Sequence, residues 1–131
     1  MIEPPTNAKL IKFSKHLFWY DNDGILCGKS LAGESSELKD IKEFMEYFIT
    51  TLNGTKICIL VDFSNVSTSN KEIREYVNNE FPKITKSLAM ISKTPLGRMM
   101  ANLFFNLKKQ PYPTKMFEDE LRAKGWLKKF L

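Results

Sequence analysis

Apolar residues recur along this chain with two periods, one typical of helices and one typical of strands. Helical spacings of three and four residues connect the apolar positions of 38–52 and reappear in 73–81, where Pro82 ends the pattern. The spacing of Ser69 and Glu72 predicts a capping box at the start of the second segment. Both segments are therefore predicted to be amphipathic helices that bury one face.

The most regular helical pattern begins after Thr94 and Pro95, a pair typical of a helix start. Its apolar stripe consists of Leu96, Met99, Met100, Leu103, Phe104 and Leu107, and we expect this stripe to face the core. Phe105 lies off the stripe. It predicts a second buried face, either within the fold or at a contact between two copies of the chain. A final helix is predicted at 118–130.

Strand-forming residues occupy the remaining segments. Residues 10–20 and 25–30 flank the turn sequence Asp21-Asn22-Asp23-Gly24, which predicts an antiparallel hairpin. Residues 56–61 are almost continuously apolar, which indicates a central strand covered on both faces. Further strands are predicted at 87–92 and, at an edge, at 114–117.

This order of elements predicts an α/β fold. We expect a single mixed β-sheet of about five strands that opens with an antiparallel hairpin and carries its helices mainly on one face. Residues 1–9 are expected to form a flexible arm, and residues 10–131 a single domain.

Composition and charge narrow the class of protein. The chain has 131 residues, of which 43% are hydrophobic, so it can bury the core of one domain. Its apolar runs are too short to span a membrane and no export signal is evident, so we expect a cytoplasmic protein. The net charge of +5 divides into −2 for residues 1–66 and +7 for residues 67–131, which permits an anionic partner.

No set of residues points to catalysis, to a metal or to a cofactor. His16 is the single histidine, and Cys27 and Cys58 lack zinc-ligand spacing, so both thiols are expected to be buried and reduced. Gly28-Lys29-Ser30 lacks the earlier glycine that a phosphate-binding loop requires. We therefore expect a protein that is not an enzyme.

Two groups of polar residues are candidates for binding a ligand or a partner. The first follows the central strand, at the sheet edge where α/β proteins bind ligands, and consists of Asp62, Ser64, Thr68 and Ser69. The second surrounds a predicted helix start and consists of Lys93, Thr94, Arg98 and Asn102. Helix N-termini attract anions, although turn formation, capping and solvation alone would also explain these residues.

Several short segments resemble STAS-like domains of the SpoIIAA-like type, which are small bacterial domains with a mixed sheet backed by helices. The segments are Ile59-Leu60-Val61-Asp62-Phe63-Ser64, then 87–91, Arg98 with 101–104, and finally 117–127. The resemblance implies the same fold from about residue 10 to residue 131. In members of the anti-anti-sigma type, a serine in the loop after the Asp-x-Ser strand end is phosphorylated. That position here reads Asn70-Lys71-Glu72, and Thr68 or Ser69 is the candidate replacement.

Two functions are consistent with these features. The first is a non-enzymatic STAS-like binding or regulatory module that contacts a protein partner or a small anionic ligand. The alternative is a carrier of a small molecule or lipid, with an apolar pocket between sheet and helices. Nucleic acid is not an expected partner, because aromatic and basic residues are not interleaved in a stacking pattern.

Overall fold

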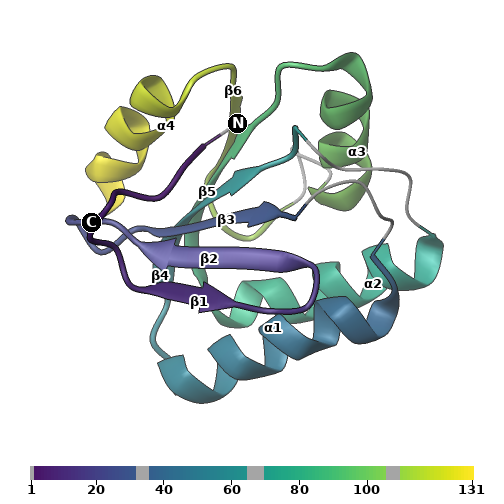
Figure 1. Cartoon of the computed structure of the whole chain (residues 1–131). Helices are drawn as coiled ribbons and strands as arrows, with labels where there is room; N and C mark the ends of the chain where they lie inside the picture. The colour runs from purple at the N-terminus through teal and green to yellow at the C-terminus, as the bar shows by residue number, and fades with distance from the viewer. Residues whose placement is uncertain (1, 32–35, 65–69, 106–109) are drawn as a thin grey trace.

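A six-stranded sheet organises the molecule (Figure 1). The computed structural model describes residues 2–31, 36–64, 70–105 and 110–131, with residues 104 and 105 described by their backbone alone. The strands are β1 (Leu10–Lys12), β2 (His16–Tyr20), β3 (Leu26–Ser30), β4 (Ile57–Asp62), β5 (Thr85–Ile91) and β6 (Thr114–Phe117). The helices are α1 (Leu38–Leu52), α2 (Lys71–Glu80), α3 (Pro95–Phe105) and α4 (Glu120–Leu127), with short 3-10 turns at Phe81–Lys83 and Lys128–Phe130.

The sheet is mixed and opens with an antiparallel hairpin, as the sequence predicts. Its strand order is β1-β2-β3-β4-β5-β6; β1, β2 and β3 pair antiparallel, whereas β3, β4, β5 and β6 pair parallel. The structure has one strand more than the expected number, because 10–20 does not form one strand. The N–H of Phe13 donates to the carbonyl of His16, and this turn divides the segment into β1 and β2.

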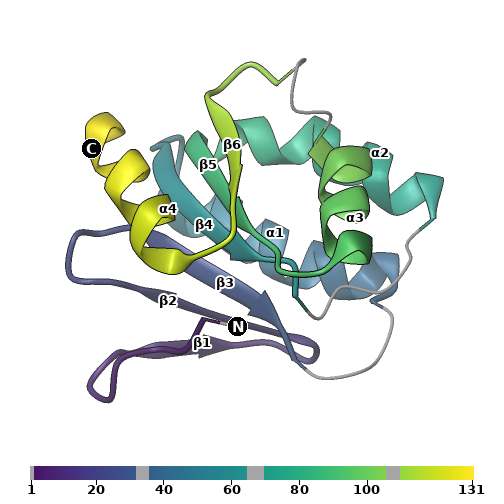
Figure 2. The same ribbon diagram turned by 90° about the horizontal axis from the view of Figure 1, so that it is seen from above.

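Both faces of the sheet are buried. On one face, the core contains Phe18, Leu26, Ile59 and Leu88 from the strands, together with side chains of α1, α2 and α3. On the other face, Trp19, Cys27 and Leu60 pack with Ala123 and Leu127 of α4. Three of the four helices thus share one face, which confirms that the helices lie mainly on one side (Figure 2).

The apolar stripe predicted for α3 is wrong in detail. Leu96, Met99 and Leu103 are exposed by 42%, 51% and 47%, whereas Met100 and Ala101 are buried. The reason is a close approach at Gly97, where a Cβ atom would lie 2.8 Å from the backbone carbonyl of Phe63. Small residues therefore decide which face of α3 turns inward, and the larger apolar side chains remain outside.

Two further expectations concern chain segments near helix and sheet ends. Helix α2 begins after Asn70, whose side chain accepts the N–H of Ile73, so Asn70 is the N-cap in place of Ser69. Part of the N-terminal segment, expected to be a flexible arm, lies against the sheet, because Ile2 is buried in the core on the α4 side.

The close approach at Gly97 predicts a large difference between two glycine substitutions. Gly97→Ala would push a methyl group against Phe63 O and the hydroxyl of Ser92, so we expect a loss of about 1–3 kcal/mol in the free energy of unfolding. Gly125→Ala is the matched control, since Gly125 lies in α4 with no atom within 4 Å of the added Cβ. It should gain about 0.5–1 kcal/mol. Urea denaturation measures both, and equal stabilities would contradict the packing described for α3.

Candidate functional site

The carboxyl ends of β4 and β5 bring the two predicted polar groups together. Asp62 and Ile91 are partners in the parallel register, and the N–H of Phe63 donates to the carbonyl of Ile91 at 2.7 Å. Helix α3 begins directly beyond this edge, where the hydroxyl of Thr94 accepts the N–H of Gly97 at 3.0 Å. Strand ends and helix start are thus one continuous region, as α/β topology predicts.

Asp62 is buried and its carboxylate is already engaged by two backbone donors. One oxygen accepts the N–H of Ser64 at 2.8 Å, and the other accepts the N–H of Ile2 at 2.6 Å. On the neighbouring strand, the ammonium of Lys29 is also buried and lies 2.9 Å from the carboxylate of Glu3. The side chains of Asp62 and Lys29 therefore hold the N-terminal segment across the ends of β3 and β4.

The remaining predicted site residues differ in accessibility. The hydroxyl of Ser64 is buried and has no hydrogen-bond partner among the described residues, whereas Lys93, Thr94 and Asn102 are exposed. Thr68 and Ser69 lie outside the described residues, and so does the side chain of Phe105. The contact between two copies at Phe105 therefore stays a prediction.

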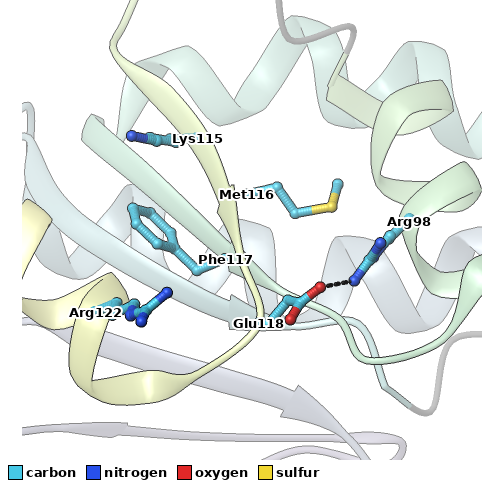
Figure 3. Close-up of a pocket in the computed structure, with 6 residues that line it drawn as sticks. All are labelled: Arg98, Lys115, Met116, Phe117, Glu118 and Arg122. Atoms are coloured by element: carbon cyan, nitrogen blue, oxygen red, sulfur yellow. Dashed lines mark hydrogen bonds and ion pairs between the residues drawn. The ribbon is translucent and has the colours of Figure 1, made fainter.

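Arg98 belongs to a different arrangement, a shallow hollow that we call the β6-edge hollow (Figure 3). It has a volume of about 510 Å³ and is lined by Arg98, Lys115, Met116, Phe117, Glu118 and Arg122. Three elements contribute these residues, since Arg98 comes from α3, Arg122 comes from α4, and β6 supplies most of the rest.

Among the described residues, the partners of the cations in the β6-edge hollow are exposed or partly exposed. Arg98 forms an ion pair with Glu118, and Nε of Arg122 lies 3.6 Å from a carboxylate oxygen of Asp119. The ammonium of Lys115 lies 5.5 Å from the centre of the Phe117 ring. Exposed ion pairs of this kind contribute little free energy, so an incoming anion can compete for the cations.

Sequence reasoning found Arg98 but missed the other residues of the β6-edge hollow. The sequence did contain a signal for these residues. Lys115 is a charged residue within a predicted edge strand, and Arg122 follows shortly after it in the basic half of the chain. Only the pairing of β6 beside β5, with α3 and α4 on opposite faces, brings these cations to one place.

His16 and Cys27, two of the groups considered for chemistry, are buried. Burial lowers the pKa of His16 to about 4, although the nearby carboxylates of Asp40 and Glu43 oppose this shift. Burial also raises the pKa of the Cys27 thiol to about 12, so this thiol is protonated at neutral pH. Both cysteines are free and buried, as expected.

The described part of the chain contains neither a group of metal ligands nor a membrane-spanning helix. Across residues 2–31, 36–64, 70–105 and 110–131, no three His, Cys, Asp or Glu side chains are grouped so that they could hold a metal ion. Within the same ranges, none of the helices has the length and apolar composition needed to cross a membrane.

This arrangement of sheet and helices is a SpoIIAA-like fold. It is shared by the crystal structure of an uncharacterised protein of the DUF3478 family with a SpoIIAA-like fold from Shewanella loihica PV-4, with a TM-score of 0.58 and 20% sequence identity. That similarity covers 92% of this chain and 91% of the other. The chain belongs to the family described as domain of unknown function DUF7793, whose model matches residues 18–131.

A second solved structure aligns with this chain over nearly its whole length. It is a protein with unknown function from Arthrobacter sp. FB24, 24% identical, with 95% of this chain and 96% of that chain covered and a TM-score of 0.30. Among curated proteins, no match to the chain is found.

The two hydrogen bonds of Asp62 lead to a prediction about the N-terminal segment. In Asp62→Asn, one of the two acceptor oxygens becomes a donor, so either Ile2 or Ser64 loses its partner however the amide is oriented. We expect a loss of about 1–3 kcal/mol in unfolding free energy and faster hydrogen exchange of the N–H of Ile2 or of Ser64, whichever loses its acceptor. Ser64→Ala is the control, because Ser64 contacts Asp62 through its backbone. Unchanged exchange at both Ile2 and Ser64 in the asparagine variant would contradict this role of Asp62.

The buried histidine leads to a prediction about pH. The unfolded chain binds a proton at His16 near pH 6.5, whereas the folded chain binds it only near pH 4. The free energy of unfolding that depends on neutral His16 is therefore fully present above about pH 6.5 and is lost as the pH falls toward 4. Because of this one group, the free energy of unfolding should decrease by on the order of 2 kcal/mol between pH 7 and pH 5. Urea denaturation of wild type and His16→Phe at both pH values tests this. If the two proteins lose the same stability, His16 is not the cause.

Proposed function

We propose that this protein is a binding module without catalytic activity, and that the β6-edge hollow recognises a carboxylate or phosphate group of its partner. The observation that carries the proposal is that three cations, Arg98, Lys115 and Arg122, line one hollow whose single lining carboxylate is that of Glu118. Guanidinium groups bind carboxylates and phosphates through paired, charge-assisted hydrogen bonds. Two of the three cations supply such groups.

The buried titratable side chains support a role without catalysis. A general base must reach the substrate, and His16 is buried beside Ser36 and Phe44, with 3.2 Å between Nε2 and the Ser36 hydroxyl. Cys27 carries a protonated thiol in the core on the α4 side. These two groups are therefore poorly suited to act as a base or nucleophile on a bound ligand.

The alternative, a carrier of a small molecule or lipid, has less support. It requires space between the sheet and the helices, and side chains occupy that region on the α1 side. The rings of Phe18 and Phe44 lie 4.9 Å apart between their centres, and those of Phe18 and Phe48 lie 5.0 Å apart. Phe13 packs against the same rings. Contacts at these distances are those of a filled core.

Lys124 and Lys128 fit a structural role better than a nucleic-acid site. Lys124 of α4 lies 3.3 Å from a carboxylate oxygen of Asp21 and 2.9 Å from one of Glu120, while Lys128 lies 3.5 Å from one of Asp23. These lysines hold α4 against the turn between β2 and β3. Part of the positive charge in the C-terminal half is therefore used within the molecule.

Charge substitutions test the proposed function. A blocked octapeptide of glutamate, titrated into the labelled protein and followed by NMR, should shift the amide signals of β6 and of the first turns of α3 and α4. The double variant Lys115→Gln/Arg122→Gln should weaken binding about tenfold, because it removes two of three attracting charges. Glu118→Gln should strengthen binding about threefold or more, since it removes the carboxylate that competes for Arg98.

The matched control is Lys9→Gln/Lys12→Gln, which removes the same charge next to and within β1, at the opposite edge of the sheet. It should change the affinity less than twofold. Inorganic phosphate, titrated separately, distinguishes a small anion from a peptide as the preferred ligand. If neither the peptide nor phosphate shifts these signals, or if both double variants weaken binding equally, the proposed function is wrong.

A further inference from the structure

Strand β6 ends the sheet, and its outer side has unpaired backbone groups in the described part of the chain. β6 pairs only with β5, because the strand order places it last. The carbonyls of Pro113 and Phe117 accept hydrogen bonds from Leu88 and Ser92 and so face β5. Because backbone groups alternate in direction along a strand, the N–H and C=O of Met116 face away from the sheet.

The β6-edge hollow follows this open edge. Side chains from both faces of the strand line it: Met116 extends toward α3, whereas Lys115 and Phe117 extend to the other side (Figure 3). A hollow that belonged to one face of the sheet would be lined by alternate residues only. The four consecutive residues Lys115, Met116, Phe117 and Glu118 therefore place the open backbone edge within the hollow.

The cations flank the open edge on both sides. Arg98 of α3 lies on the face of the sheet that also holds α1 and α2, whereas Arg122 of α4 lies on the opposite face. Successive side chains of an added strand would point alternately to these two faces. Two adjacent acidic residues in such a strand could reach Arg98 on one side and Arg122 or Lys115 on the other.

This geometry selects between the occupants that could cover the edge. A second copy of this chain pairing through its own β6 would bring the two sets of cations together, and like charges across a strand pair are unfavourable. An acidic helix would match the charges but has no free backbone groups to pair with Met116. An extended acidic segment satisfies both the charges and the backbone groups.

We propose that the β6 edge binds an extended acidic segment of a partner protein as a seventh strand, paired with the N–H and C=O of Met116 and held by Arg98, Lys115 and Arg122. This inference rests on the proposed function and adds the form of the partner. Recognition by strand addition draws affinity from backbone hydrogen bonds and specificity from alternate side chains. The partner is thus expected to contain two adjacent acidic residues among strand-forming residues.

Four synthetic peptides test the proposal on the 131-residue chain. The first is a blocked octapeptide of threonine and valine with two adjacent glutamates at its centre. The second has the same sequence with N-methyl groups on alternate backbone nitrogens, which keeps the charges and removes hydrogen-bond donors. The third carries the methyl groups on the other set of nitrogens, so that one of the two blocks the edge-facing donors whichever way the peptide is oriented. Isothermal titration calorimetry should give at least a tenfold weaker affinity for one of the methylated peptides. A glutamine-for-glutamate peptide should also bind at least tenfold more weakly.

Hydrogen exchange gives a readout on the protein side with an internal control. The N–H of Met116 should exchange at least tenfold more slowly when the unmethylated peptide is bound. The N–H of Phe117 faces β5 and should already exchange slowly without it. This measurement needs no substitution in β6, so a folding defect cannot imitate the result.

The outcomes separate this inference from the proposed function. Tenfold weakening by methylation together with slower exchange at Met116 supports strand addition. Equal affinities for the plain and methylated peptides, with about tenfold weaker binding in Lys115→Gln/Arg122→Gln, overturn strand addition and leave the anion-binding function standing. Binding of inorganic phosphate but of none of the acidic peptides overturns strand addition alone. Binding of neither the peptides nor phosphate at millimolar concentration overturns both.

Discussion

Burial of both faces of the sheet is the constraint on which the rest of the structure depends. Leu60 and Ile59 are neighbours in β4, yet one packs beneath α4 and the other beneath the helices of the opposite face. A parallel strand of this kind is stable only when covered on both sides. The crossover helices α1, α2 and α3 provide this cover on one face and α4 provides it on the other, and β1 and β6 are the edge strands of the described sheet.

Polar side chains at the strand ends serve this packing first. Asp62 and Lys29 are buried charged residues, and both are engaged by the N-terminal segment, through the N–H of Ile2 and the carboxylate of Glu3. A buried charge without a partner is costly, so these contacts hold the segment over the ends of β3 and β4. The charges that we propose for binding lie elsewhere, at the β6-edge hollow, where Arg98 is exposed by 47% and Arg122 by 83%.

Helix α3 illustrates why periodicity alone is an incomplete guide. The sequence predicts its position correctly, but the face it buries was expected to carry Leu96, Met99 and Leu103, all of which are exposed. Hydrophobic spacing finds a stripe, whereas the distance of approach to the sheet depends on the smallest residues. Gly97 and Ala101 permit a contact with Phe63 and its neighbours that larger side chains would prevent. Nothing in the local sequence shows whether the apolar spacing or the small residues decide which face of α3 is buried.

The sequence by itself determined the α/β class, the opening hairpin, the central position of β4, the bounds of β6 and the similarity to SpoIIAA-like domains, since each depends on short-range spacing or turn residues. Tertiary structure alone decided that 10–20 forms two strands, and which face of α3 is inward. It also decided that Lys115 and Arg122 join Arg98 at one sheet edge. These features depend on contacts between residues distant in the chain, and spacing within a segment carries no information about which distant segments meet.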